Sequence, residues 1–334
     1  MSGSRLRRPP GALALGLAVL VGASGAAGVI IGARQSTAQV ERVPDMQESL
    51  AVNDGPAENF LLVGSDSREG TSDDDPNADQ IGTESEVTGR RSDTIMILRR
   101  EKDGGAALLS LPRDLWVPIS GTDHSSKINS AYNEGAGRLA RTVTEALGIP
   151  IHHYVEIDFQ GFQTLVDAIG GIELCVPNPA RDTKSGLALE PGCQEIDGTT
   201  GLAYARSRTY EEFVDGDWQL DGRADLGRIE RQQLFIRTAV NEVLGQVRDD
   251  PFALGDLIDA GAGAVRLDES TDPLAAAEAL RAAAEIGLAT YTLPVDPITI
   301  GDQSALELAE GADAVLAYFN GTGPQPAPDA TVPG

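Results

Sequence analysis

Arginine and aspartate are concentrated in a few short segments of this acidic chain. These segments are 64–68, 90–94, 112–114, 127–129, 206–208 and 225–228. Guanidinium groups contact phosphate oxygens through paired hydrogen bonds, and carboxylates hold a hard divalent cation. Without a cation, Asp66 and Asp93 would repel a phosphate. The residue types therefore predict a phosphate site with a metal ion. The alternative is a set of surface salt bridges, each typically worth under about 1 kcal/mol.

Two spacings favour a shared site over scattered ion pairs. Asp225, Arg228 and Gln232 stand at i, i+3 and i+7 of a helix predicted over 225–247, so they share one helix face. Arg206 and Arg208 alternate in a segment that we interpret as extended, which would project both side chains to the same side.

Composition excludes several other classes of protein. The chain has 334 residues, 41% of them hydrophobic, which is ordinary for a globular protein. Its formal net charge of -25 argues against general binding of nucleic acid, whose phosphate backbone repels an acidic surface. The glycine patterns of serine hydrolases, Walker nucleotidases and Rossmann enzymes are missing from the sequence.

The N-terminus predicts a membrane anchor. An uncharged run, Gly11–Ile31, follows basic residues and is about long enough to cross a bilayer. We expect a transmembrane helix over 11–33, a cytoplasmic N-terminus over 1–10, and an exported body. A cleaved signal peptide is the alternative, because small residues around Ala23–Ala27 could form a protease site.

The rest of the chain reads as a linker over 34–56, one domain over 57–320 and a disordered Pro/Gly-rich tail over 321–334. Short apolar runs predict strands at 60–63, 94–98, 106–111, 154–157, 172–176 and 291–293. Amphipathic spacing predicts helices at 139–147, 159–169, 225–247, 273–286 and 306–319. Strands and helices alternate, so we expect an α/β fold of three layers, with a central mixed sheet flanked by helices.

Three smaller features have competing interpretations. Cys175 and Cys193 are the only cysteines, and an exported body permits a disulfide between them. Zinc is the alternative, although the three histidines are not arranged to complete a site. The acidic run 73–75 could bind a cation but is more typical of a solvated loop. The pair His152 and His153 is interpreted as structure at the start of a strand.

The charged segments, in their order along the chain, resemble the LytR-CpsA-Psr family. The match runs from about Asn59 to Val247. Each motif is weak alone, but the ordered set is specific. The motifs are Gly-Ser-Asp-Ser-Arg, Arg-Ser-Asp-Thr, Leu-Pro-Arg-Asp, Lys-Ile-Asn-Ser-Ala-Tyr, Asp-Phe-Gln-Gly-Phe, Val-Asp-Ala-Ile-Gly-Gly, Ala-Tyr-Ala-Arg-Ser-Arg and Gly-Arg-Ile-Glu-Arg-Gln-Gln. The Ala-, Gly- and Arg-rich usage favours an actinobacterial source.

The resemblance implies an α/β domain with an apolar pocket for a polyprenyl chain and a pyrophosphate at its mouth. Asp66 and Asp93 match the aspartates associated with Mg²⁺, which Mn²⁺ could replace. The polar groups around the pyrophosphate are matched by Arg91, Arg113, Lys127, Arg206, Arg208, Arg228 and Gln232. Arg68 of the first motif is a further candidate for binding the pyrophosphate. Phe159, Phe162, Leu165 and Val166 are candidates for pocket lining, although such a stripe is more often core.

The activity implied is transfer of a glycopolymer from a polyprenyl pyrophosphate carrier onto peptidoglycan. Arg206 and Arg208 would stabilise the leaving phosphate, and Asp225 is the favoured general base for the acceptor hydroxyl. Two alternatives stay open. One is hydrolysis of polyprenyl pyrophosphate at the same site, and the other is a non-catalytic binder of anionic lipid or polymer with a regulatory role. The long acidic segment between Arg208 and Asp225 leaves the acceptor side undefined.

Overall fold

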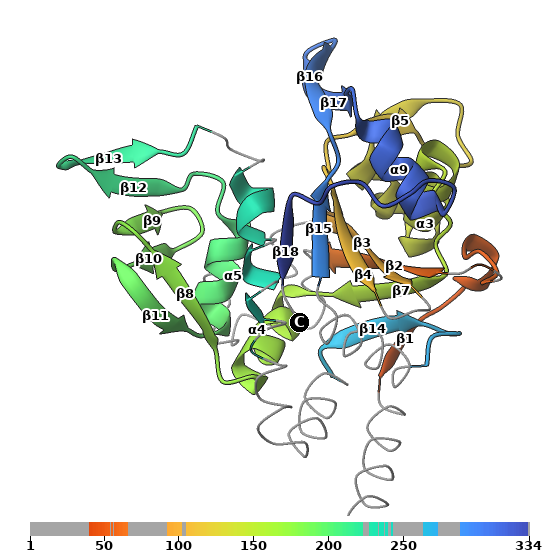
Figure 1. The fold of residues 1–334 in the computed structure, drawn as a ribbon. Coiled ribbons are helices and arrows are strands. Elements are labelled where there is room, and N and C mark those ends of the chain that lie inside the picture. Colours follow the sequence, from red (N-terminus) through yellow and green to blue (C-terminus); the bar gives the residue numbers. More distant parts are fainter. Residues whose placement is uncertain are drawn as a thin grey trace, which may run out of the picture.

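The computed structural model describes residues 40–53, 55, 57–65, 92–101, 105–222, 227–232, 234–236, 238–239, 242, 263–272 and 288–332 (Figure 1). The helix predicted over 11–33 lies outside these residues. Within them, no helix is long and apolar enough to cross a membrane.

An eight-stranded sheet forms the centre of the described fold. Its order is β1-β14-β7-β2-β3-β4-β15-β18, and it mixes parallel and antiparallel pairs. Along the chain the strands are β1 (Glu41–Val43), β2 (Ala57–Ser65), β3 (Ser92–Glu101), β4 (Ala106–Leu111), β7 (His153–Ile157), β14 (Val265–Asp268), β15 (Leu288–Thr292) and β18 (Ala330–Val332). The predicted α/β class with a central mixed sheet is therefore confirmed.

The largest hydrophobic cluster packs on one face of this sheet, against α3 (Ala136–Leu147), η2 (Ile128–Glu134) and α9 (Ala312–Asn320). Helix α3 forms where the sequence predicts it, because Leu139 and Val143 recur at helical spacing, and it ends at Gly148 in the left-handed conformation. A second apolar cluster lies on the opposite face, with Ile236 packed against it.

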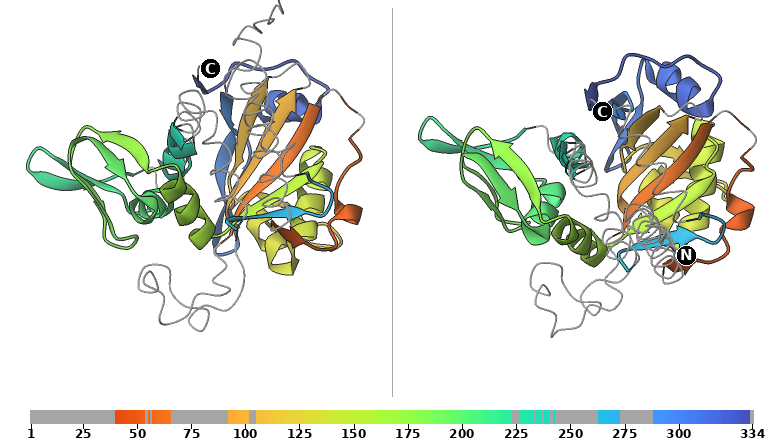
Figure 2. Two further views of the ribbon diagram at one scale, coloured as in Figure 1. Left: turned by 90° about the horizontal axis from the view of Figure 1, so that it is seen from below. Right: turned by 60° about the horizontal axis from the view of Figure 1, so that its bottom comes forward.

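A smaller lobe lies beside the sheet and is joined to it through α4 (Phe159–Ala168) (Figure 2). It contains α5 (Gly198–Arg206), the paired strands β8 (Ile172–Val176) and β11 (Gly192–Ile196), and a four-stranded sheet. That sheet has the order β10-β9-β12-β13, from β9 (Ala180–Asp182), β10 (Leu187–Leu189), β12 (Glu211–Val214) and β13 (Asp217–Leu220). The lobe has its own hydrophobic cluster.

Two β-hairpins project from the body of the molecule (Figure 1). One is β12–β13, whose two-residue turn places Asp215 and Gly216 at φ angles of 55° and 88°. An Asp-Gly pair with both φ angles positive is the favoured hairpin turn. The other hairpin is β16 (Val295–Ile300) with β17 (Gln303–Leu308). A small third hairpin pairs β5 (Trp116–Pro118) with β6 (Ser125–Lys127).

The structure corrects two predicted boundaries. The linker over 34–56 contains β1, which pairs with β14, and also the 3-10 helix η1 (Gln47–Ser49), beside which Val43 and Met46 are buried in the main core. The tail predicted as disordered over 321–334 contains β18, which pairs with β15. Both strands are three residues long, and their partners are distant in the sequence, so neither leaves a periodic signal.

Two predicted elements are also wrong in detail. The helix predicted over 306–319 is divided between strand β17 and helix α9, with Gly311 in the left-handed conformation at the start of the helix. Arg206 is the last residue of helix α5 instead of lying in an extended segment. Asp197 caps the start of that helix by accepting a hydrogen bond from Thr200 N, and its small apolar residues are buried in the lobe.

Candidate functional site

The strands β2, β4, β7 and β15 run in one direction, so their last residues meet along one edge of the sheet. We call this the carboxyl edge and define it by Ser65, Leu111, Ile157 and Thr292. In the sequence, Asp66 directly follows β2, Arg113 stands two residues after β4, and Phe159 stands two residues after β7. In open α/β sheets, ligands bind outside the carboxyl ends of strands. The topology thus brings several of the predicted segments together.

A β-bulge lies at this edge. Gly64 pairs with Thr94 and Ser65 pairs with Ser92, so Asp93 has no partner on β2. Bulges re-aim side chains beside functional sites. The approach is close at Gly64, since an added Cβ would lie 3.0 Å from Thr94 Cβ and Thr94 would have to shift by a few tenths of an ångström. Several predicted site residues lie outside the described residues, namely Asp66, Arg68, Arg91 and Asp225. The side chain of Asp93 lies outside them as well.

Buried hydroxyl groups anchor the end of β2 from inside the fold. Tyr132 donates a hydrogen bond from its hydroxyl to Ser65 Oγ at 3.2 Å, and Tyr154 donates to Glu156 Oε2 at 2.8 Å. Burial raises the pKa of Tyr154 well above its usual range, and the charge of Glu156 and hydrogen bonds to Glu156 and Tyr132 raise it further. Arg266 balances Glu156, with Nη1 3.0 Å from Oε1. The residue before Asp66 is therefore held in place.

A carboxylate brings two of the predicted cations together. Asp114 Oδ1 lies 3.1 Å from Lys127 Nζ, and its Oδ2 lies 3.7 Å from Arg113 Nε. The backbone supports this arrangement because Asn129 N donates to Arg113 O at 3.2 Å. Both cationic side chains keep part of their surface exposed, 18% for Arg113 and 28% for Lys127. They can therefore still contact a ligand.

Arg206 reaches the carboxyl edge by stacking on Phe159. Its guanidinium carbon lies 4.3 Å above the centre of that ring, and Phe159 follows β7 by two residues. Helix α4 begins there because Asp158 accepts a hydrogen bond from Gly161 N at 2.7 Å. The lobe packs tightly at this point, since a Cβ at Gly161 would meet Ala264 O at 2.1 Å. A stacked, oriented guanidinium suits recognition of a phosphate.

The segment from Ser207 to Thr209 is fixed by a residue that sequence reasoning missed, Asp182 on β9. This buried carboxylate accepts hydrogen bonds from Ser207 Oγ at 2.7 Å, Arg208 N at 3.1 Å and both N and Oγ1 of Thr209 at 2.8 Å. Burial would raise the pKa of Asp182, but these bonds and those from the neighbouring backbone outweigh it and lower the pKa to about 2. Asp182 lies 26 residues before Arg208 in the sequence, so their contact is visible only in the folded structure.

The helical residues 227–232 clamp the same segment from the other side. Gln232 donates from Nε2 to Ala205 O at 3.0 Å, and Arg231 donates from Nη2 to Ser207 O at 2.7 Å. Arg231 also pairs with Asp221 at 3.0 Å. Arg228 is buried, with 2% of its surface exposed. Gln232 therefore meets the segment of Arg206 and Arg208 at the C-terminus of α5, and Arg228 lies one helical turn before Gln232. Arg231 was not singled out from the sequence.

The four candidate lining residues of α4 lie in or beside the apolar interior of the smaller lobe. Phe159 packs against Leu202, and Val166 belongs to the lobe's hydrophobic cluster. Phe162 lies 5.2 Å from Phe235, ring centre to ring centre. Leu165 is half-buried. Their role in lining a lipid pocket stays a prediction.

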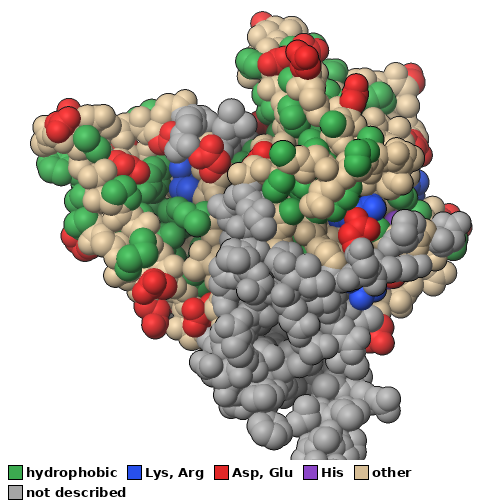
Figure 3. All heavy atoms as spheres, in the orientation of Figure 1, with side chains coloured by type: hydrophobic (Ala, Val, Ile, Leu, Met, Phe, Trp, Pro, Cys, Tyr) green, Lys and Arg blue, Asp and Glu red, His purple; other side chains and the backbone are tan. Residues whose placement is uncertain are grey.

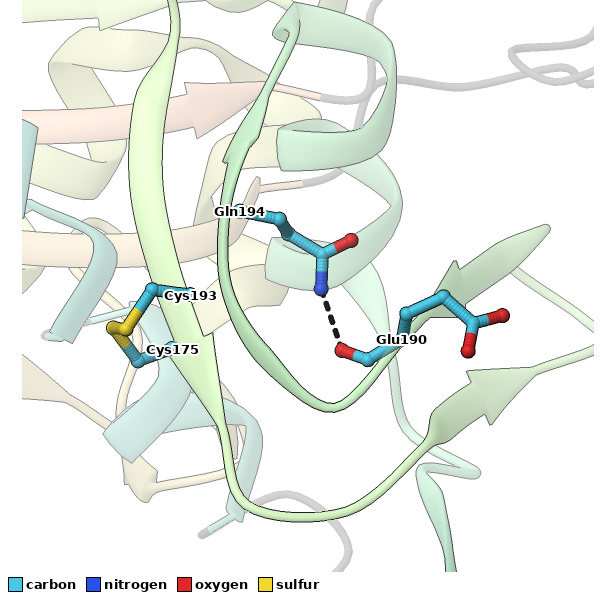
Figure 4. Close-up of a disulfide and its surroundings, with 4 residues drawn as sticks. All are labelled: Cys175, Glu190, Cys193 and Gln194. Atoms are coloured by element: carbon cyan, nitrogen blue, oxygen red, sulfur yellow. Dashed lines mark hydrogen bonds between the residues drawn. A yellow bond between two sulfur atoms is a disulfide. The ribbon is translucent and has the colours of Figure 1, made fainter.

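The cysteines form the predicted disulfide (Figure 4). Cys175 and Cys193 face each other across β8 and β11, and nearby Gln194 Nε2 donates to Glu190 O at 2.6 Å. The pairing commits both sulfurs, so the nearby Glu173 does not complete a metal site with them. The histidine pair is structural as predicted. His152 Nδ1 accepts from Asn59 N at 2.9 Å, and β7 begins at His153.

The chain is similar in sequence to several known proteins. The model of the LytR_cpsA_psr family matches residues 28–312. A probable cell wall biosynthesis protein, LcpB of Corynebacterium glutamicum, is 35% identical over 239 residues, which cover 71% of this chain and 54% of that protein. A polyisoprenyl-teichoic acid--peptidoglycan teichoic acid transferase, TagU of Halalkalibacterium halodurans, is 33% identical over 216 residues, which cover 64% of this chain and 61% of that protein.

A solved structure gives the same architecture. The LytR-Csp2A-Psr enzyme from Actinomyces oris superposes with a TM-score of 0.66 at 25% identity, over 88% of this chain and 99% of that one. The Corynebacterium and Actinomyces matches agree with the predicted actinobacterial character. This chain spans little more than half the length of the Corynebacterium relative.

Proposed function

Since the chain belongs to the LytR-CpsA-Psr family, we propose that it is a phosphotransferase that moves a glycopolymer from a polyprenyl pyrophosphate carrier onto peptidoglycan. The observation that carries the proposal is the meeting of arginines around the C-terminus of α5, with Arg206 stacked at the carboxyl edge of the sheet. The name of the TagU relative describes the same class of reaction.

In this mechanism the protein supplies position and charge. Phosphoryl transfer needs little covalent chemistry from the enzyme, so fixed cations provide most of the stabilisation. Arg206 and Arg208 would bind the phosphate that leaves with the polyprenyl chain, while Arg113 and Lys127 would orient the pyrophosphate. Asp225 would accept the proton of the attacking sugar hydroxyl.

We further propose that Asp66 and Asp93 would hold a divalent cation at the carboxyl edge. Asp66 directly follows the anchored Ser65, and Asp93 is the bulge residue beside it. Two carboxylates at adjoining strand ends are suitable ligands for Mg²⁺ or Mn²⁺. When bound, such an ion would neutralise charge on the pyrophosphate.

The proposed location is the outer face of the cytoplasmic membrane, with residues 11–33 as the single transmembrane helix and the N-terminus in the cytoplasm. This arrangement would place the catalytic domain where a lipid-linked glycan and peptidoglycan meet. The disulfide supports it, because disulfides persist in oxidising compartments. Membrane fractionation before and after a carbonate wash distinguishes a retained anchor from a cleaved signal.

The test is incubation of the full chain in detergent with polyprenyl pyrophosphate-linked glycan, Mg²⁺ and peptidoglycan, followed by mass analysis of the products. Transfer gives glycan-phosphate joined to peptidoglycan together with polyprenyl monophosphate. Hydrolysis gives free glycan-phosphate, and simple binding gives no product. Either of the last two results would contradict the proposed transferase and favour the corresponding alternative.

A further inference from the structure

The β12–β13 hairpin carries an exposed apolar face on an otherwise acidic protein. Phe213 and Trp218 are cross-strand partners, and Leu220 lies two residues beyond Trp218, so the three side chains share one face. Phe213 is 39% exposed and Leu220 is 59% exposed. Figure 3 shows hydrophobic side chains at the surface of this lobe with acidic side chains among them. Grouped exposed apolar side chains of this kind are a candidate binding surface.

The aromatic side chains are held in position before any ligand arrives. The guanidinium of Arg181 stacks 4.0 Å from the centre of the Trp218 ring, and its Nε lies 2.7 Å from Glu211 Oε2. Phe213 packs at an angle of 60° against Trp218, with ring centres 5.4 Å apart. A rigid aromatic surface loses little conformational entropy on binding.

Charge narrows the class of ligand. Residues 209–222 contain five carboxylates and no lysine or arginine. This segment would repel an anionic lipid surface or a phosphate-rich polymer, because Arg181, which stacks on Trp218, is paired with Glu211 and leaves the other carboxylates in excess. Uncharged sugars fit it, because their apolar C–H faces stack on aromatic rings while their hydroxyls donate hydrogen bonds to carboxylates and amides.

The hairpin is rigidly connected to the arginine segment. Two adjacent residues of β9 contact the hairpin and the arginine segment. Arg181 stacks on Trp218 of the hairpin, and Asp182 accepts hydrogen bonds from Ser207, Arg208 and Thr209. The base of the hairpin closes where Asp221 N donates to Tyr210 O at 2.7 Å. Each strand has four residues and is about 13 Å long at 3.3 Å per residue. That length can contact several consecutive sugar rings.

We propose that the face of Phe213, Trp218 and Leu220 binds the acceptor of the reaction as an uncharged polysaccharide strand. The identification of this ligand as the acceptor rests on the proposed function. Binding of the polysaccharide itself can be measured without turnover. It gives a role to the acidic segment that separates Arg208 from Asp225.

Calorimetric titration of the full chain with neutral oligomers of N-acetylglucosamine tests the binding directly. We expect affinity to rise with oligomer length and to fall at least about 10-fold in Trp218→Ala and in Phe213→Ala, or about 1.4 kcal/mol. Leu220→Ala, at a more exposed position, gives a second variant that leaves the aromatic pair intact and should weaken binding less. Ile300→Ala on the other hairpin is the matched control, because Ile300 is 40% exposed.

A kinetic measurement separates this inference from the proposed function. In the Trp218→Ala variant, the KM for a glycan acceptor should rise while the KM for the lipid-linked donor and the release of glycan-phosphate to water stay unchanged. Unaltered oligomer affinity in both aromatic variants would overturn the inference. So would a change in oligomeric state without any binding of sugar, which would assign the face to a protein partner. Retained sugar binding without any transfer would count against the proposed function alone.

Discussion

Replacing Asp182 by asparagine tests whether one buried carboxylate fixes the arginine segment. The folded-state pKa of Asp182 is about 2 against an ordinary value of 3.8, so its charge stabilises the folded protein at neutral pH. The gap between these values corresponds to about 2.5 kcal/mol. Asparagine lacks the charge and presents an NH₂ donor to N–H groups. We expect Asp182→Asn to lower the free energy of unfolding by about 2.5 kcal/mol at pH 7.

The pH dependence of this loss has a definite sign. Because the pKa is lowered by folding, the stabilisation is present above pH 4 and disappears as the pH falls toward 2. The difference between wild type and Asp182→Asn should therefore shrink to about 1.3 kcal/mol at pH 3. Urea unfolding of both proteins at pH 7 and pH 3 measures it.

Transfer activity should fall further than stability alone explains. Without the carboxylate, Arg208 loses its backbone anchor, and displacement of a catalytic group by about 1 Å can cost about 100-fold in rate. Asp197→Asn is the control, since Asp197 caps α5 through Thr200 N at 2.8 Å without touching the arginine segment. A destabilisation that is equal at both pH values, or full activity in Asp182→Asn, would refute the reasoning.

Three further predictions concern the phosphate site, the disulfide and the metal. Arg206→Ala or Arg208→Ala should each reduce transfer at least about 100-fold with folding retained, measured by product formation and circular dichroism. Reduction of the disulfide should lower the free energy of unfolding by about 3 kcal/mol, because it closes a loop of 18 residues; an unchanged urea midpoint would contradict this. Asp66→Ala or Asp93→Ala should abolish the Mg²⁺ dependence of transfer, while neutralising residues 73–75 should do little; equal losses would move the metal to that loop.

The sequence predicts the central strands well because they are continuous apolar runs. The predicted bounds of β4 and β8 match the observed bounds, since each is bordered by residues that break the run. The edge strands β1 and β18 and the projecting hairpin β16–β17 were missed. Strands β1 and β18 pair with strands far away in the sequence, which no local period reports. Most residues of β16 and β17 are exposed or half-buried, so these two strands do not form an apolar run.

The candidate site likewise contains residues that the sequence could predict and one residue that it could not. Motifs could group Arg206, Arg208, Arg228 and Gln232. The structure brings Gln232 to the end of α5, where Arg206 and Arg208 lie, and buries Arg228 one turn before Gln232. Asp182 could not be found, because its hydrogen-bonding partners lie 25 to 27 residues away and its own neighbours suggest only a local turn. A residue that positions others is identified from its hydrogen-bonding partners, and these can be seen only in the folded structure.

Carboxylates hold the cations of this site in place instead of cancelling them. Asp114 pairs with Arg113 and Lys127 while leaving both partly exposed, and Asp182 binds the backbone around Arg208 and not its guanidinium. Fixed charges need no reorganisation when a negative transition state forms, which is the main source of electrostatic catalysis. A net charge of -25 meanwhile makes the rest of the molecule unattractive to polyanions. In the proposed function, Asp114 and Asp182 would keep the positive groups in place, while the acidic remainder of the surface would disfavour binding of a pyrophosphate elsewhere.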